Sequence, residues 1–124
     1  QTNYTAADLN WNDSSSRSTL EMKGDKSRPA MAGPADVAQY DVVFVGFPIW
    51  WYQAPRIIET FLESCDFSGK TLVPFATSGG SGMGKTESIL KACCAQTAKW
   101  LPGKRLSSRE SAASVRKWVD SLGL

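Results

Sequence analysis

The sequence predicts an α/β fold with a parallel sheet, and three observations support this expectation. Two short runs, 40–46 and 71–76, are rich in β-branched and aromatic residues and are apolar on both faces, as buried parallel strands are. A helical pattern follows each run. A third short strand pattern and a closing helical pattern continue this alternation, which is typical of α/β layers with right-handed crossovers.

The first 39 residues are expected to form an irregular arm, because Asn, Ser, Gly and Pro interrupt regular structure throughout this segment. Short extended pieces are predicted near 7–9 and 19–22. Trp11 is interpreted as an anchor that holds the arm on the domain rather than as a ligand contact. The hydroxyl-rich run 14–18 contains no glycine and follows no buried strand, so it is not predicted to bind phosphate.

Residues 40–124 contain the strand and helix units. Pro55 suits the first turn of a helix with an apolar stripe, made of Ile57, Ile58, Phe61 and Leu62. Pro74 weakens the prediction of the second strand, because proline cannot donate to a sheet ladder and prefers an edge. The other expected elements are a helix over 85–97, a short strand over 103–107 and a helix over 111–122, with Val115, Trp118, Val119 and Leu122 facing inward.

The composition limits the classes of function. With 124 residues, 42% of them apolar, the chain can form one modest core, so 1–124 is expected to be a single domain. The absence of histidine disfavours Ser-His-Asp and Cys-His nucleophiles, and neither a catalytic side chain nor a metal site is expected. A net charge of +2 is far from the dense basic stripe of nucleic-acid-binding proteins.

Three cysteines, Cys65, Cys93 and Cys94, have no C-x-x-C spacing and are expected to pack rather than to react. On the predicted helix, Cys93 and Cys94 would project about 100° apart, one inward and one outward. Cysteine usage fits a reducing compartment, and no apolar run has the length of a bilayer span. A cytoplasmic protein without membrane association is therefore expected.

Two loops that follow the predicted strands carry the functional hypothesis. The aromatic loop consists of Pro48, Ile49, Trp50, Trp51 and Tyr52, and the glycine loop consists of Thr77, Ser78, Gly79, Gly80, Ser81 and Gly82. The carboxyl ends of parallel strands meet at one edge of a sheet, where open α/β folds bind ligands, so the loops are expected side by side. Aromatic faces and bare backbone N–H groups together suit a flat, conjugated, hydrogen-bonding ring.

With these loops, the chain resembles the flavodoxin family. Further matching pieces are Ala54-Pro55, Phe61-Leu62-Glu63 and the run from Asp66 to Thr71. The resemblance implies a flavodoxin-like, doubly wound sheet that binds flavin mononucleotide (FMN) without a covalent link. It also implies that the aromatic loop covers one side of the isoalloxazine ring and that the glycine loop lies at the ring's pyrimidine edge.

The resemblance further implies electron transfer with a redox partner protein or a small-molecule electron acceptor. Flavodoxins open with a buried strand and a phosphate-binding turn, and no such segment is found here, so the fold is expected to be incomplete on its N-terminal side. An unpaired strand edge would also favour a homodimer.

Three other functions compete with this interpretation. One is an FMN-dependent NAD(P)H:quinone-type reductase, which uses similar loops, and another is a truncated, non-catalytic flavodoxin-like module. The third is nucleotide binding, because residues 79–86 match the Walker A pattern G-x-x-x-x-G-K-[ST]. Nucleotide hydrolysis is disfavoured, because no acidic residue ends another predicted buried strand to hold magnesium.

Overall fold

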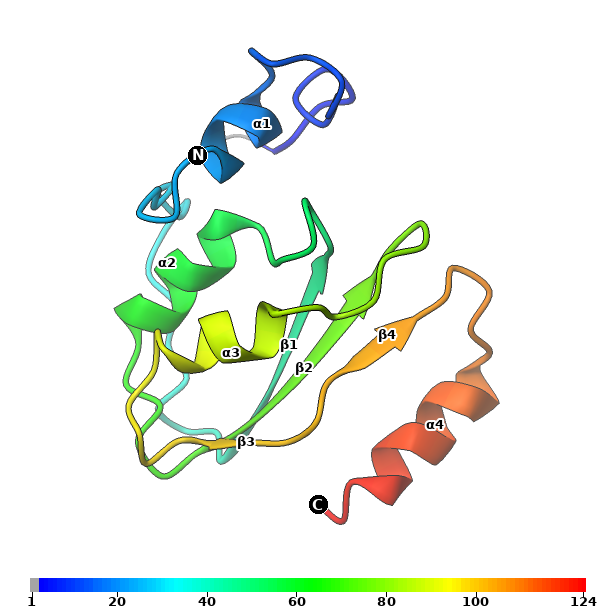
Figure 1. Ribbon diagram of the computed structural model, residues 1–124. Coiled ribbons are helices and arrows are strands. Elements are labelled where there is room, and N and C mark those ends of the chain that lie inside the picture. Colours follow the sequence, from blue (N-terminus) through cyan, green and yellow to red (C-terminus); the bar gives the residue numbers. More distant parts are fainter. Residues whose placement is uncertain (1–2) are drawn as a thin grey trace.

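The computed structural model describes residues 3–124 and shows a four-stranded parallel sheet with helices on both faces (Figure 1). Strand β2 is central, because β1 pairs with one edge of it and both β3 and β4 pair with the other. The strands are β1 (Val42–Pro48), β2 (Thr71–Thr77), β3 (Lys99–Trp100) and β4 (Lys104–Leu106), and the helices are α1 (Arg17–Met22), α2 (Arg56–Ser64), α3 (Thr86–Lys91) and α4 (Ala112–Ser121).

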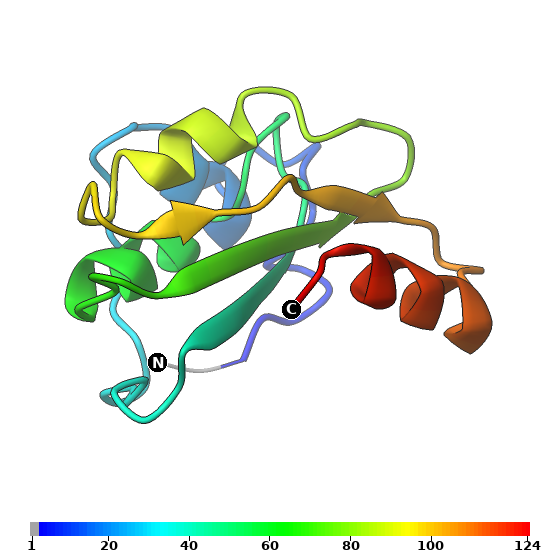
Figure 2. The ribbon, with the colours of Figure 1, turned by 90° about the horizontal axis from the view of Figure 1, so that it is seen from below.

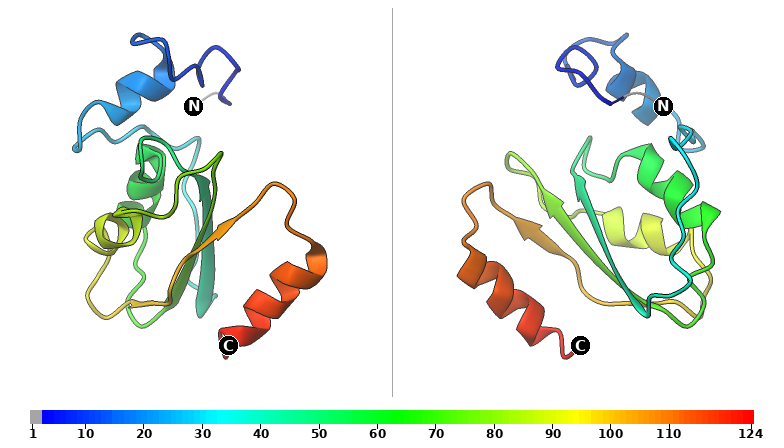
Figure 3. Two further views of the ribbon diagram at one scale, coloured as in Figure 1. Left: turned by 45° about the vertical axis from the view of Figure 1, so that its right-hand side comes forward. Right: turned by 180° about the vertical axis from the view of Figure 1, so that it is seen from behind.

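The predicted fold class is confirmed, including the parallel order of the strands. Helices α2 and α3 cover one face of the sheet, and α4 lies on the opposite face (Figures 2 and 3). The arm that contains α1 lies beyond the carboxyl ends of β1 and β2. Strand β3 was not anticipated, since it comprises only two residues.

Pro74 lies in the middle of the central strand β2, although proline was expected to prefer an edge strand. Thr71 N donates to Asp41 O on the β1 side, so the even-numbered residues of β2 turn their N–H groups toward β3 and β4. The missing N–H of Pro74 therefore faces the interruption between β3 and β4. Gly103 lies in this gap, because a Cβ atom there would be 3.1 Å from Pro74 Cγ.

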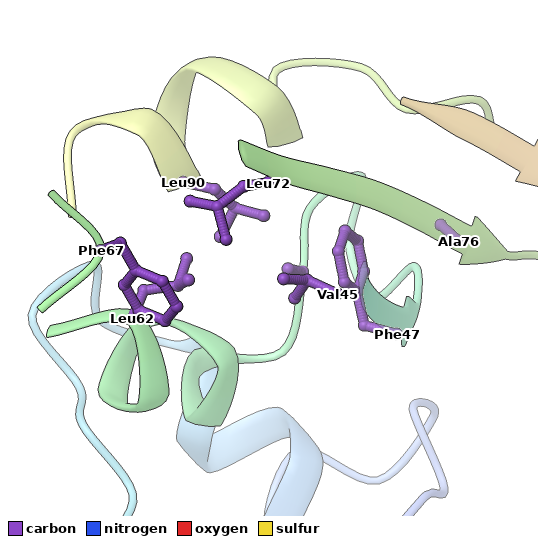
Figure 4. Close-up of a cluster of buried hydrophobic side chains, with 8 residues drawn as sticks. Val45, Phe47, Leu62, Phe67, Leu72, Ala76 and Leu90 are labelled. Atoms are coloured by element: carbon purple, nitrogen blue, oxygen red, sulfur yellow. The ribbon is translucent and has the colours of Figure 1, made fainter. Parts of the chain in front are cut away.

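The buried core lies between the sheet and the α2–α3 layer (Figure 4). Its side chains come from strands β1 and β2, helices α2 and α3, and the turns that precede α2 and β2: Val45, Phe47, Ala54, Leu62, Phe67, Leu72, Ala76 and Leu90. Leu62 lies on the apolar stripe predicted for α2 and is almost fully buried. Burial of this stripe supplies most of the stability of a short amphipathic helix.

The opposite face of the sheet is more thinly covered. Ser111 caps α4 by accepting a hydrogen bond from Ser114 N, so this helix begins where the sequence predicts it. The predicted inward residues of α4 are only half-buried, because they meet the sheet mainly through Trp118, whose ring packs edge-on to Phe44 and Phe75. The ring of Phe75 lies directly over Gly46, where a Cβ atom would be 2.3 Å from it.

Three expectations about the arm are wrong. Residues 7–9 lie in a turn, in which Leu9 N donates to Thr5 O at 3.2 Å, rather than in an extended piece. Residues 19–22 belong to helix α1 rather than to an extended piece, because the hydroxyl of Ser16 caps the helix by accepting a hydrogen bond from Thr19 N. Trp11 is 70% exposed and does not anchor the arm. Other residues attach the arm, among them Tyr4, whose ring packs edge-on against Trp50 at 5.4 Å between centroids.

Helix α3 is shorter than the predicted helix over 85–97 and ends at Lys91. Cys93 and Cys94 follow it in a turn, so the helical spacing expected for them does not apply. Both are half-buried against the core, and burial raises the pKa of each thiol to about 11. Cys65, Cys93 and Cys94 are all free thiols. The two thiols of this turn are therefore protonated at neutral pH, which agrees with the expected packing role.

None of the helices within residues 3–124 combines the length and the hydropathy that crossing a bilayer requires.

Candidate functional site

The two predicted loops leave the same edge of the sheet. In the parallel register of β1 and β2, Pro48 lies opposite Thr77, so both strands end at the same level. Ile49 N then donates to Thr77 O at 2.9 Å and extends the pairing by one residue into the loops. The expectation that the aromatic and glycine loops are neighbours is therefore confirmed.

The loops enclose a cavity of about 510 Å³. Three segments line it: Ile49, Trp50, Trp51 and Tyr52 from the aromatic loop, Gly79, Gly80 and Ser81 from the glycine loop, and Leu9, Trp11 and Ser18 from the arm. The structure thus brings most of the predicted loop residues together around one space. It adds a third segment that the sequence did not indicate as part of the site.

Four predicted residues, Pro48, Thr77, Ser78 and Gly82, lie outside the lining of the cavity. Pro48 and Thr77 are the last residues of their strands and belong to the sheet ladder. Ser78 organises the glycine loop from within. The arm residues were missed because their positions depend on long-range contacts. The one available signal was Trp11, a large aromatic residue in a polar segment.

The aromatic loop is a strained two-residue turn. Trp50 and Gln53 exchange reciprocal backbone hydrogen bonds of 2.8 and 3.0 Å, and the residues between them, Trp51 and Tyr52, have φ angles of 46° and 64°. Two positive φ angles are the requirement of a type I′ turn, which normally selects Asn-Gly. Bulky side chains at such positions are held at an energetic cost, and strain of this kind is concentrated at functional sites.

We expect Tyr52→Gly to be more stable than Tyr52→Ala by about 1 kcal/mol, because only glycine adopts a positive φ without steric cost. Both variants remove the same ring, which is 72% exposed and contributes little to packing. Urea denaturation of the two variants measures the difference. Equal free energies of unfolding would show that the turn carries no such strain.

The glycine loop is closed by the hydroxyl of Ser78. Its oxygen accepts hydrogen bonds from Gly80 N at 3.1 Å and from Arg105 Nε at 3.2 Å, and its proton is donated to Ser81 O. Arg105 also donates to Ser78 O at 3.3 Å. The N–H of Gly80 is therefore used within the loop and not offered to a ligand.

Other backbone donors of the glycine loop remain available. Within residues 3–124, the N–H groups of Gly79, Ser81 and Gly82 have no protein acceptor. The guanidinium of Arg105 places a positive charge against the same loop. This combination favours a ligand edge that carries hydrogen-bond acceptors and negative charge.

The aromatic loop also contacts the segment that follows the glycine loop. Gly84 has a φ of 54°, and a Cβ atom at this position would lie 3.0 Å from the carbonyl oxygen of Tyr52. The segment that follows the glycine loop therefore packs against the aromatic turn with no room for a side chain. This contact sets the separation between the two walls of the cavity.

The position of Thr86 does not favour a nucleotide site at the Walker A pattern. Thr86, whose hydroxyl would have to face a magnesium ion, is fully buried at the start of α3. Its hydroxyl has no partner among residues 3–124 and lies in the interior of the protein. Nor does the described chain contain a cluster of three or more side chains that could hold a metal ion.

Comparisons with known proteins agree with the fold. The family model described as flavodoxin matches residues 1–122. A crystal structure from Bacteroides eggerthii, described as a "putative flavoprotein", is 45% identical with a TM-score of 0.87, and the match covers 99% of this chain and 77% of that one. A second structure with the same description, from Bacteroides uniformis, is 47% identical with a TM-score of 0.86, and its match covers 94% and 74%. No curated protein matches the chain significantly.

Proposed function

The chain belongs to the flavodoxin family, and on this premise we propose that it binds FMN in the cavity between the aromatic and glycine loops and takes part in electron transfer. The observation that carries the proposal is the meeting of an aromatic turn and a loop with available N–H groups around one cavity. Family membership and two structurally similar proteins described as "putative flavoprotein" support a flavin ligand.

The residues around the cavity fit an isoalloxazine ring. A volume of about 510 Å³ lies in the range of small-molecule sites. Trp51 and Tyr52 offer aromatic faces at the surface, being 41% and 72% exposed. The N–H groups of Gly79 and Ser81 supply donors for the ring's polar edge. A flat, partly polar ring can stack on the aromatic side chains and accept hydrogen bonds from the backbone N–H groups.

When bound, the flavin supplies the redox chemistry itself. The chain's part is to bind the ring, to exclude water with the aromatic turn and to stabilise negative charge at the polar edge. Backbone donors of the glycine loop, with Arg105 behind them, provide this stabilisation without a titrating side chain. Proton transfer by a protein acid or base is not required.

Contacts to the ring, rather than to a phosphate, dominate this site. Within residues 3–124, the Ser/Thr- and Gly-rich turn between β2 and α3 is the glycine loop, which is assigned here to the polar edge of the ring, and no second strand leads into a turn that is rich in both Ser/Thr and Gly and could hold a phosphate group. We therefore expect this chain to bind riboflavin and FMN with similar affinity. A preference for FMN of tenfold or more would reveal a phosphate contact that the described residues do not suggest.

The test is titration of FMN with the protein while flavin fluorescence is recorded. Stacking against an indole is expected to quench the emission strongly, and Trp51→Ala is expected to reduce both affinity and quenching. Trp118→Ala is the matched control, because this indole packs on the opposite face of the sheet. Unchanged FMN fluorescence at saturating protein, or retention of ATP with magnesium instead, would refute the proposal.

A second candidate activity, NAD(P)H:quinone-type reduction by the flavin-loaded protein, is favoured by the exposed rings at the rim of the cavity. Trp11, Trp51 and Tyr52 are all exposed there and could stack on a second flat molecule. Oxidation of NAD(P)H that depends on an added quinone would support this activity. Its absence, with flavin bound, would leave single-electron exchange with a protein partner as the favoured role.

A further inference from the structure

We propose that the arm is the third wall of the ligand site, and that the hydroxyl of Ser18 hydrogen-bonds directly to the bound flavin. This inference rests on the proposed function and extends it to residues outside the two loops. The observations that carry it are an unpartnered buried hydroxyl and an exposed indole on the same side of the cavity.

The Ser18 hydroxyl is the first observation. Ser18 is only 2% exposed and lines the cavity, yet its Oγ has no hydrogen-bond partner among residues 3–124. A buried hydroxyl without a partner is costly, and such groups in folded proteins usually have a specific explanation. Its backbone N–H is already satisfied by Asp8 O at 2.9 Å, so the side chain alone remains to be paired. A ligand in the cavity supplies the missing partner.

Trp11 and Leu9 are the second observation. They line the same cavity and are 70% and 43% exposed, so neither is buried against the protein. Exposed aromatic and aliphatic side chains that gather at a cavity rim typically mark a binding surface. A planar ligand would cover them, which accounts for an indole that does not anchor its own segment.

The position of the arm is tied to the aromatic loop, as the third wall of a site requires. Tyr4 packs edge-on against Trp50, and its hydroxyl donates to Glu21 on α1 at 2.7 Å. The guanidinium of Arg17 lies 3.7 Å from the centre of the Tyr4 ring. These contacts fix α1, and with it Ser18, relative to the aromatic loop.

The test compares FMN affinities of wild type, Ser18→Ala and Trp11→Ala. We expect each variant to bind FMN about three- to tenfold more weakly, as the loss of one hydrogen bond or one stacked ring predicts. Ser108→Ala is the matched control, because Ser108 is an exposed serine outside the cavity. Thermal melting confirms folding, since Ser18→Ala removes only an unpartnered hydroxyl.

Each result has a separate meaning. Wild-type affinity in Ser18→Ala overturns the assignment of the hydroxyl, and wild-type affinity in Trp11→Ala overturns the role of the arm as a wall. Failure of the wild-type protein to bind flavin refutes the proposed function itself, and this inference with it.

Amide hydrogen exchange provides a readout that needs no variant. If the arm closes on the ligand, FMN should slow exchange across 5–22 and leave helix α4 unchanged. Equal exchange in the arm with and without bound FMN would also overturn the proposal.

Discussion

Arg56→Leu is expected to lower the free energy of unfolding by about 3–5 kcal/mol, because it leaves the Glu59 carboxylate buried without its main partner. Arg56 and Glu59 are 4% and 3% exposed, and their side chains meet at 3.1 Å. The remaining cation near Glu59 is Arg28, at the longer distance of 3.7 Å. Arg56 also donates to Met22 O at 3.5 Å, so the substitution removes a contact between α2 and the arm.

Chemical denaturation measures this effect, and two further variants separate its causes. Arg56→Leu combined with Glu59→Leu removes both charges and is expected to recover most of the lost stability, since an apolar pair can replace a buried ion pair. Glu63→Gln, which alters the exposed partner of Arg28, should change the free energy by less than about 0.5 kcal/mol. If Arg56→Leu were as stable as Glu63→Gln, the buried pair would not support the fold.

Gly84→Ala is expected to weaken FMN binding severalfold, since small displacements of the groups that line a site reduce their fit to the ligand. The added Cβ would lie 3.0 Å from Tyr52 O, so the aromatic loop and the segment after the glycine loop must move apart by a few tenths of an ångström. The positive φ of 54° adds a cost of about 1–2 kcal/mol to the free energy of folding.

Gly82→Ala is the matched control for this prediction. It lies in the glycine loop, a Cβ atom there would meet nothing within 4 Å, and its φ is not in the left-handed range. Fluorescence titration of both variants with FMN gives the comparison, and denaturation gives the accompanying loss of stability. Similar affinities for Gly82→Ala and Gly84→Ala would show that the loop contact does not set the shape of the cavity.

The parts of the fold that the sequence predicted well are those dictated by local pattern. Strands β1 and β2 have apolar residues on both faces, a pattern that few other elements share. Helix α2 has a clear apolar stripe that contains Leu62. Because the two strands are parallel neighbours, the position of the two loops followed from topology without knowledge of any side-chain contact.

The parts that the sequence did not predict depend on tertiary context. Helix α3 ends at Lys91, although the helical pattern continues, because the chain must turn there to reach β3. Pro74 is tolerated in a central strand only because the neighbouring ladder is interrupted beside it. The unpaired hydroxyl of Ser18 could not be predicted, since it depends on the three-dimensional surroundings of that residue.

Because Phe75 packs over Gly46, substitutions at these two positions are expected to be coupled in evolution. A hydrogen atom is the only substituent at residue 46 that leaves room for this ring, which in turn supports Trp118 of the covering helix. Any lineage that acquires a side chain at position 46 must therefore reduce or reorient the residue at position 75. Covariation among glycine, phenylalanine and the helix indole should consequently accompany divergence of this sheet face.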